Sequence, residues 1–153
     1  MKKALLAMVV IAGAIYGVYR WRSEPAPAPK HQENLVTDRL WVDHIPRNDR
    51  DTIQVFLALT EEPIGAFQAA SAWKGQYEIF KYEAHGDEYR MVFPQTGSRD
   101  KVKATATECS RGGMDYCLEL DGTSRGVKKY YSREGWEIGS LNDAEKLTKQ
   151  LAQ

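Results

Sequence analysis

Apolar and polar residues alternate over several short segments between residues 39 and 138 of this chain. The segment 52–59 shows the pattern most clearly: isoleucine, valine and leucine occupy every second position, and Phe56 lies on the opposite face. A period of two is typical of β-strands, because successive side chains point to opposite faces of a sheet. The predicted strands are 39–43, 52–59, 76–84, 88–93, 102–109, 116–120 and 127–131, with one further candidate at 136–138.

Residues 64–73 fit two interpretations. Their alanines, preceded by Thr60 and Pro63, are compatible with a short helix. Their position between two strands, with Phe67 and Trp73 on one face of a period-two pattern, is compatible with a strand. We favour the strand.

The last segment, 141–153, has the apolar spacing of a helix. Leu147 and Leu151 are four residues apart, so they share one helical face. Asn142 or Asp143 is the predicted N-terminal cap, because side chains of this kind accept hydrogen bonds from the first free amides of a helix.

Seven to nine short strands at this spacing predict an antiparallel up-and-down barrel or a sandwich. Closure into a barrel is favourable because it leaves no unpaired edge strand. In strand number and size the pattern resembles lipocalin-type barrels, whose interior can hold one small ligand. The Gly-x-Trp signature of that family is absent, since Trp73-Lys74-Gly75 runs in the opposite order, so the resemblance is one of architecture.

A basic start, Met1-Lys2-Lys3, precedes an uncharged and mostly apolar run from Ala4 to Tyr19. This order predicts a signal anchor or transmembrane helix over residues 1–22, with cleavage as a secretory signal as the alternative. Residues 23–37 are rich in proline and alanine and predict a stalk. We therefore expect a single-pass inner-membrane protein whose β domain, residues 38–140, lies in the periplasm, or a secreted periplasmic protein after cleavage.

Charge is divided unevenly along the chain. Residues 1–30 carry five Lys or Arg against one acid, and residues 31–153 carry sixteen against twenty. A nucleic-acid-binding domain is expected to be basic, so this mildly acidic domain is not predicted to bind nucleic acid.

Cys109 and Cys117 flank the turn-forming segment 110–113 and lie on the polar faces of two predicted strands. An antiparallel pairing with Cys109 opposite Cys117 would place Thr107 opposite Glu119 and bring the two thiols close enough for a disulfide. A disulfide agrees with export from the cytoplasm. Free thiols are the alternative, and no nearby ligands complete a zinc site.

Candidate binding residues follow from side-chain type, and no catalytic, metal-binding or cofactor-binding motif is present. If the barrel is hollow, inward aromatic and thioether side chains would line an apolar ligand. A basic segment would meet anionic lipid headgroups or an acidic partner. The candidate lining residues are Trp73, Tyr77, Tyr89 and Met91, and the candidate anionic contacts are Arg125, Lys128, Lys129 and Arg133.

Three functions are compatible with these observations. The first is a membrane-tethered extracytoplasmic domain that acts as a protein-interaction, accessory or scaffold subunit of the cell envelope. The second is a carrier of a small apolar ligand inside the barrel. The third is an envelope enzyme; we do not expect one, because His44 and His85 lack the surroundings of a catalytic histidine.

Overall fold

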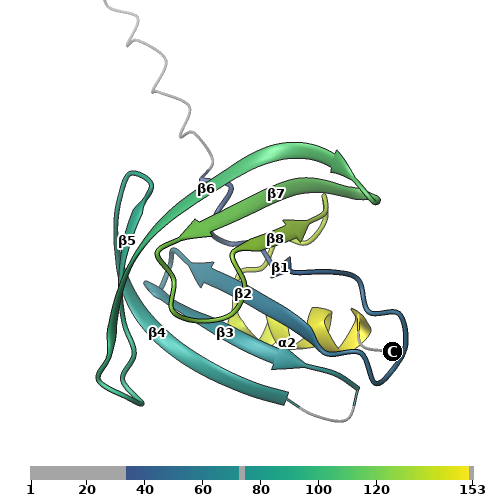
Figure 1. Ribbon diagram of the computed structural model, residues 1–153, viewed down its shortest axis with the longest axis horizontal. Helices are drawn as coiled ribbons and strands as arrows, with labels where there is room; N and C mark the ends of the chain where they lie inside the picture. Colours follow the sequence, from purple (N-terminus) through teal and green to yellow (C-terminus); the bar gives the residue numbers. More distant parts are fainter. Residues whose placement is uncertain (1–33, 73–74, 152–153) are drawn as a thin grey trace, which may run out of the picture. The chain divides into compact units, whose positions relative to one another are not determined.

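The computed structural model describes residues 34–72 and 75–151. Eight antiparallel strands form one closed barrel, in which each strand pairs with its neighbours in chain order and β8 pairs with β1 (Figure 1). The predicted mainly β fold is confirmed, and the strands form one ring rather than the two sheets of a sandwich. The strands are β1 (Trp41–Val42), β2 (Ile53–Leu59), β3 (Ile64–Ala70), β4 (Gly75–His85), β5 (Glu88–Val92), β6 (Arg99–Arg111), β7 (Met114–Asp121) and β8 (Lys129–Ser132).

The ambiguous segment 64–73 forms a strand, β3, over residues Ile64–Ala70. The candidate strand at 136–138 makes only a single bridge, between Glu137 and Arg39. The long strands β4 and β6 curve strongly around the barrel (Figure 1). The predicted strand interpretation is therefore confirmed for 64–70, and the extra strand is not formed.

Aromatic rings fill the inside of the barrel. The ring centroid of Phe56 in β2 lies 5.2 Å from that of Phe67 in β3 and 6.0 Å from that of Phe80 in β4. On its other side, Phe56 lies 5.9 Å from Tyr130 of β8. All eight strands contribute to this buried cluster, so side chains occupy the barrel axis. Its members are Val36, Trp41, Phe56, Ala58, Phe67, Phe80, Tyr82, Tyr89, Met91, Phe93, Val102, Ala104, Leu118, Leu120 and Tyr130.

Gly65 in β3 allows one of these rings to lie against the strand. A Cβ atom at this position would overlap the ring of Phe80 and the carbonyl oxygen of Leu57. The absence of a side chain at Gly65 therefore lets the interior reach its observed packing.

The outer face of β2 is buried as well, because the C-terminal part of the chain covers it. Helix α2 (Leu141–Leu151) contributes the buried Ala144 and Thr148, and Trp136 precedes it. The apolar face predicted from every second residue of β2 thus belongs to a second cluster, outside the barrel. Its members are Leu40, Val42, Ile53, Val55, Leu57, Leu59, Ala66, Ala70, Met114, Trp136, Ile138 and Ala144.

The predicted C-terminal helix is confirmed over the residues that the structure describes, but its predicted cap is wrong. Ser140 is the capping residue: its Oγ accepts a hydrogen bond from the amide of Asp143 at 3.2 Å and donates one to the Asp143 carboxylate at 2.7 Å. The Ser140 hydroxyl thereby satisfies one free amide at the start of the helix, as an N-terminal cap does.

The hairpin of β6 and β7 carries the predicted disulfide between Cys109 and Cys117, whose Cα atoms lie 5.7 Å apart. The predicted register is wrong by two residues, since Cys117 lies opposite Thr107 rather than Cys109. The register shifts between Glu108 and Arg111, which indicates a bulge on β6. The disulfide is therefore diagonal across the hairpin.

Removing this disulfide should lower stability without dissolving the barrel. The double replacement of Cys109 and Cys117 by serine is expected to lower the free energy of unfolding by about 2 kcal/mol, because the loop that the disulfide closes is short. Urea unfolding monitored by tryptophan fluorescence measures the change. An unchanged unfolding midpoint would show that the cross-link restrains nothing in the unfolded chain.

The packed domain includes residues that the sequence assigned to the stalk. The predicted anchor and residues 23–33 lie outside the described part of the chain, but Val36 is buried with the barrel interior. Its carbonyl oxygen accepts a hydrogen bond from Trp41 Nε1 at 3.0 Å, and Asn34 Nδ2 donates to the Tyr89 hydroxyl at 2.8 Å. Residues 34–37 therefore pack with the barrel.

Candidate functional site

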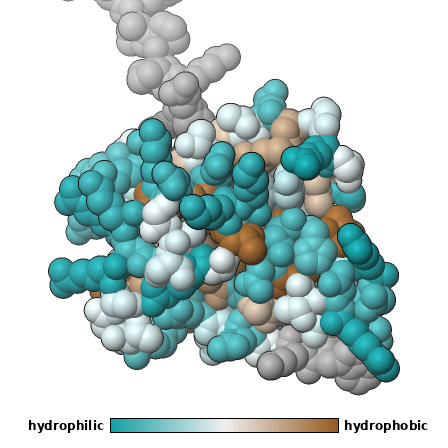
Figure 2. Space-filling model, in the orientation of Figure 1, coloured by the Kyte–Doolittle hydropathy of each residue, from teal (hydrophilic) through white to brown (hydrophobic). Residues whose placement is uncertain are grey.

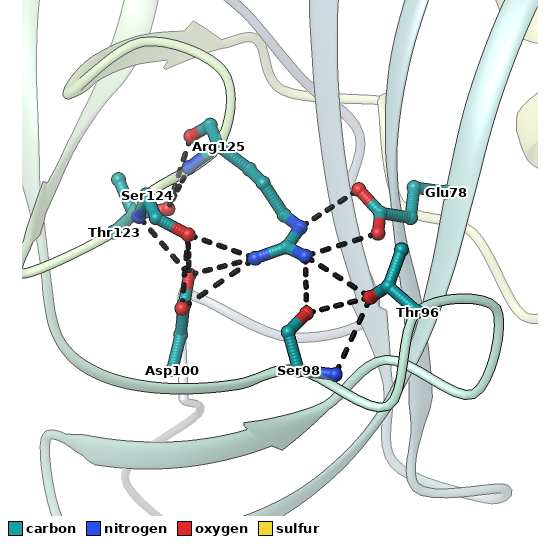
Figure 3. Close-up of polar contacts among 7 residues, drawn as sticks. All are labelled: Glu78, Thr96, Ser98, Asp100, Thr123, Ser124 and Arg125. Atoms are coloured by element: carbon teal, nitrogen blue, oxygen red, sulfur yellow. Dashed lines mark hydrogen bonds and ion pairs between the residues drawn. The ribbon is translucent and has the colours of Figure 1, made fainter.

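The densest polar cluster of the described domain surrounds Arg125, in the loop between β7 and β8 (Figure 3). Three other segments meet there: β4 supplies Glu78, the loop after β5 supplies Thr96 and Ser98, and β6 supplies Asp100 near its start. Residues distant in sequence meet here because the barrel brings these segments together at one place.

The guanidinium of Arg125 makes a two-point ion pair with Glu78. Its Nε lies 2.7 Å from one carboxylate oxygen and its Nη2 lies 3.1 Å from the other. The opposite Nη1 lies 3.5 Å from Asp100 and donates to Ser124 Oγ at 2.8 Å. Hydrogen bonding to Glu78, more than the charge of Asp100, raises the pKa of Arg125 above its usual range.

The same guanidinium also covers the end of the aromatic interior. Its Cζ lies 3.5 Å from the ring centroid of Phe93, a cation–π contact, and the Arg125 side chain is 17% exposed. Each guanidinium nitrogen has at least one acceptor, and the loop is held from its other side by Ser124, whose amide donates to Asp100 at 3.0 Å. We interpret the Arg125 cluster as a structural cluster that joins the β7–β8 loop to β4 and to the start of β6, rather than as a reaction centre.

The four candidate anionic contacts are not gathered into one patch. Arg125 is paired with carboxylates, as described above. Lys128 and Lys129 are exposed at the start of β8, whereas Arg133 follows its other end and lies 5.7 Å from the Trp136 ring. The two arginines therefore contact different parts of the domain.

The candidate ligand-lining residues are also separated. Tyr89 and Met91 of β5 point into the barrel and belong to the packed interior. Tyr77 of β4 is 67% exposed, and Trp73 lies outside the described residues. Tyr89 and Met91 pack against other buried side chains inside the barrel. These side chains occupy the space that an interior ligand would need.

Burial has a measurable consequence for the interior tyrosines. Removal from water raises the pKa of Tyr82 and of Tyr130 to about 12. It also raises the pKa of Tyr89. The Tyr82 hydroxyl also donates a hydrogen bond to the carbonyl oxygen of Leu59 at 2.7 Å.

An alkaline titration should reveal these groups. Because the neutral form of Tyr82 and Tyr130 is favoured in the fold, their stabilising effect is complete below the unfolded value of about 10 and is lost as the pH rises towards 12. In the folded protein, part of the phenolate absorbance at 295 nm should therefore appear only as the pH approaches 12. This part should be absent when the chain is unfolded in guanidinium chloride. A single transition near 10 in the folded protein would contradict a packed interior.

His44 lies between two carboxylates. Its Nδ1 is 2.9 Å from Asp43 and its Nε2 is 3.2 Å from Asp51. The predicted strand 39–43 is shorter in the structure, since β1 ends at Val42, so Asp43 and His44 both belong to a loop. A hydrogen bond from the Arg47 amide, and then one from His44, lowers the pKa of Asp51.

The exposed face of β4, β5 and β6 carries a cationic groove that the sequence analysis missed. It has a volume of about 840 Å³, and we call it the β4–β6 groove. Each of its cations is an ordinary polar-face residue of its own strand, and only the strand register shows that they are neighbours. Its lining includes Ile64, Lys81, Arg90, Val92, Arg99 and Lys101.

A second groove, of about 900 Å³, lies between α2 and the outer face of β3 and β4. Small and apolar side chains, among them Ala66, Ala70 and Ile79, form part of its lining. Both grooves lie outside the barrel wall. Over residues 34–72 and 75–151, no cluster of three or more His, Cys, Asp or Glu side chains is arranged to hold a metal ion.

No family model, curated protein or solved structure matches this chain. The structure itself defines the class of protein: a closed eight-stranded antiparallel barrel with an external C-terminal helix. Of the helices in the described part of the chain, none has the length and apolar character to span a bilayer.

Proposed function

We propose that this protein is a membrane-tethered, extracytoplasmic β domain that acts as a protein-interaction or accessory subunit of the cell envelope. The observation that carries the proposal is the contrast between the two sides of the barrel wall. The interior is filled by buried rings, whereas grooves with volumes of about 840 and 900 Å³ lie on the outside. A recognition role for such a domain falls on its outer surface.

Two other features support this proposal. The apolar segment that follows Lys2 and Lys3 is compatible with an anchor, and the Cys109–Cys117 disulfide is compatible with an oxidising compartment. The face in Figure 2 is mostly hydrophilic with small, separate apolar patches, as expected of a domain held in water rather than in lipid. We also propose that the barrel is lipocalin-like in architecture, because its strands pair in chain order.

Membrane fractionation, intact-mass measurement and cross-linking test the proposal together. We expect the native protein in the membrane fraction, a mass that retains residues 1–22 and lacks two hydrogens, and a stoichiometric cross-linked protein. A cytosolic protein with reduced Cys109 and Cys117 would refute it. A lipid recovered in stoichiometric amount, without a protein partner, would instead favour the carrier function, for which the interior rings would have to move.

A further inference from the structure

The β4–β6 groove has an apolar centre between cations, and the strand register defines this arrangement. Val92 of β5 lies opposite Lys81 of β4 on one side and opposite Arg99 of β6 on the other. Ile64 of β3 continues the same row beyond Lys81. Val92 is 40% exposed, so the centre of the groove is accessible to a partner.

The next row along these strands adds two cations. Arg90 of β5 lies opposite Lys101 of β6, and both contact one carboxylate, that of Glu88, at 3.2 and 2.8 Å. Opposite Arg90 on β4 is Glu83. Among the described residues that line the groove, the four cations outnumber the two acids, Glu83 and Asp100, and the Asp100 side chain is directed to Arg125.

Within the described residues, Lys81 and Arg99 make no ion pair, so their charges are available to a ligand. This positive excess contrasts with the acidic balance of residues 31–153 as a whole. A local field opposite in sign to that of its domain is the pattern expected of a surface that selects an oppositely charged partner.

We propose that the β4–β6 groove binds an extended, acidic segment of the partner protein, an inference that rests on the proposed function. Arg99 and Lys101 lie two residues apart on one strand, so they repeat at about 6.6–7 Å, the repeat of alternate side chains in an extended peptide. Alternate carboxylates of the segment, which share the face turned towards the groove, meet these cations. The concave, apolar-centred shape fits a narrow chain better than a flat lipid surface.

Fluorescence anisotropy with the full-length protein in detergent tests this proposal. The probe is a labelled, extended peptide with glutamate at alternate positions separated by valine, and the comparison probe has glutamine in place of glutamate. The double variant Lys81→Glu/Arg99→Glu should weaken binding of the acidic probe by about tenfold or more, because two attractions become repulsions. Glu83→Gln should strengthen it by about twofold.

The matched control is Arg50→Glu/Lys146→Glu, which makes the same charge change at two exposed positions outside the groove. Charges remote from the ligand are screened in physiological salt, so we expect this control to bind within about twofold of the wild type. Thermal unfolding of each variant verifies that the barrel is intact.

Four results would overturn the proposal: no binding by the wild type, equal binding of both probes, equal loss in the control variant, or binding only to phosphatidylglycerol vesicles. Cross-linking in membranes separates this inference from the proposed function. A partner that Lys81→Glu/Arg99→Glu still captures would exclude the groove and leave the interaction role intact. The wild type could instead capture no partner and still bind the acidic probe through Lys81 and Arg99. That result would exclude only the interaction role.

Discussion

Replacing Phe56 by alanine is expected to lower the free energy of unfolding by about 3–5 kcal/mol, the largest effect of any substitution considered for this protein. The ring is fully buried and lies between Phe67 and Phe80 on one side and Tyr130 on the other. Its removal forfeits both the burial of the ring and its aromatic contacts, and the closed barrel limits how far the strands can move inward to fill the space.

The matched control is Tyr77→Ala, which removes an aromatic ring that is 67% exposed and should change stability by no more than about 0.5 kcal/mol. Urea unfolding measures both variants. The cavity left by Phe56→Ala is apolar, so added benzene should raise the unfolding midpoint of this variant and not that of the wild type. If the two substitutions cost the same, the barrel interior is not packed around Phe56.

Replacing Arg125 by methionine should cost about 2–4 kcal/mol. The change removes the cation that contacts Glu78 and Asp100, and it leaves the two carboxylates partly buried with no ion-pair partner from Arg125. Arg125→Lys should fall between the wild type and the methionine variant, because an ammonium cannot make the two-point contact with Glu78 or cover the Phe93 ring in the same way.

A double-mutant cycle separates the ion pair from general packing. Adding Glu78→Gln to Arg125→Met should recover part of the lost stability, since one uncompensated carboxylate is then absent. Lys129→Met is the control, because Lys129 is an exposed cation nearby in sequence and should change stability by about 0.5 kcal/mol or less. Equal losses for Lys129→Met and Arg125→Met would contradict the structural role of the Arg125 cluster.

The strand pattern was predictable because local alternation determines it. Segment 52–59 shows this well, since β2 covers Ile53–Leu59. What the pattern did not show is that both faces of β2 are buried, one against the rings and one against α2. A period of two identifies the two faces of a strand but not what each face contacts.

The hairpin of Cys109 and Cys117 shows the same division at smaller scale. Residue types and turn glycines were sufficient to predict the pairing of the two cysteines. The register was not predictable, because a bulge between Glu108 and Arg111 shifts the ladder, and no local pattern marks such an insertion.

Sequence alone determined most of the elements, the mainly β class and the disulfide, because these depend on neighbours a few residues apart. Only the tertiary structure decided which charged side chains are paired. In the sequence Arg125 belongs to a basic segment with Lys128 and Lys129, but in the fold it forms an ion pair with Glu78, 47 residues away. It also decided that Lys81 and Arg99 lie on either side of Val92. The physical reason is that electrostatic interactions depend on distance in space, and strand pairing sets that distance without regard to separation along the chain.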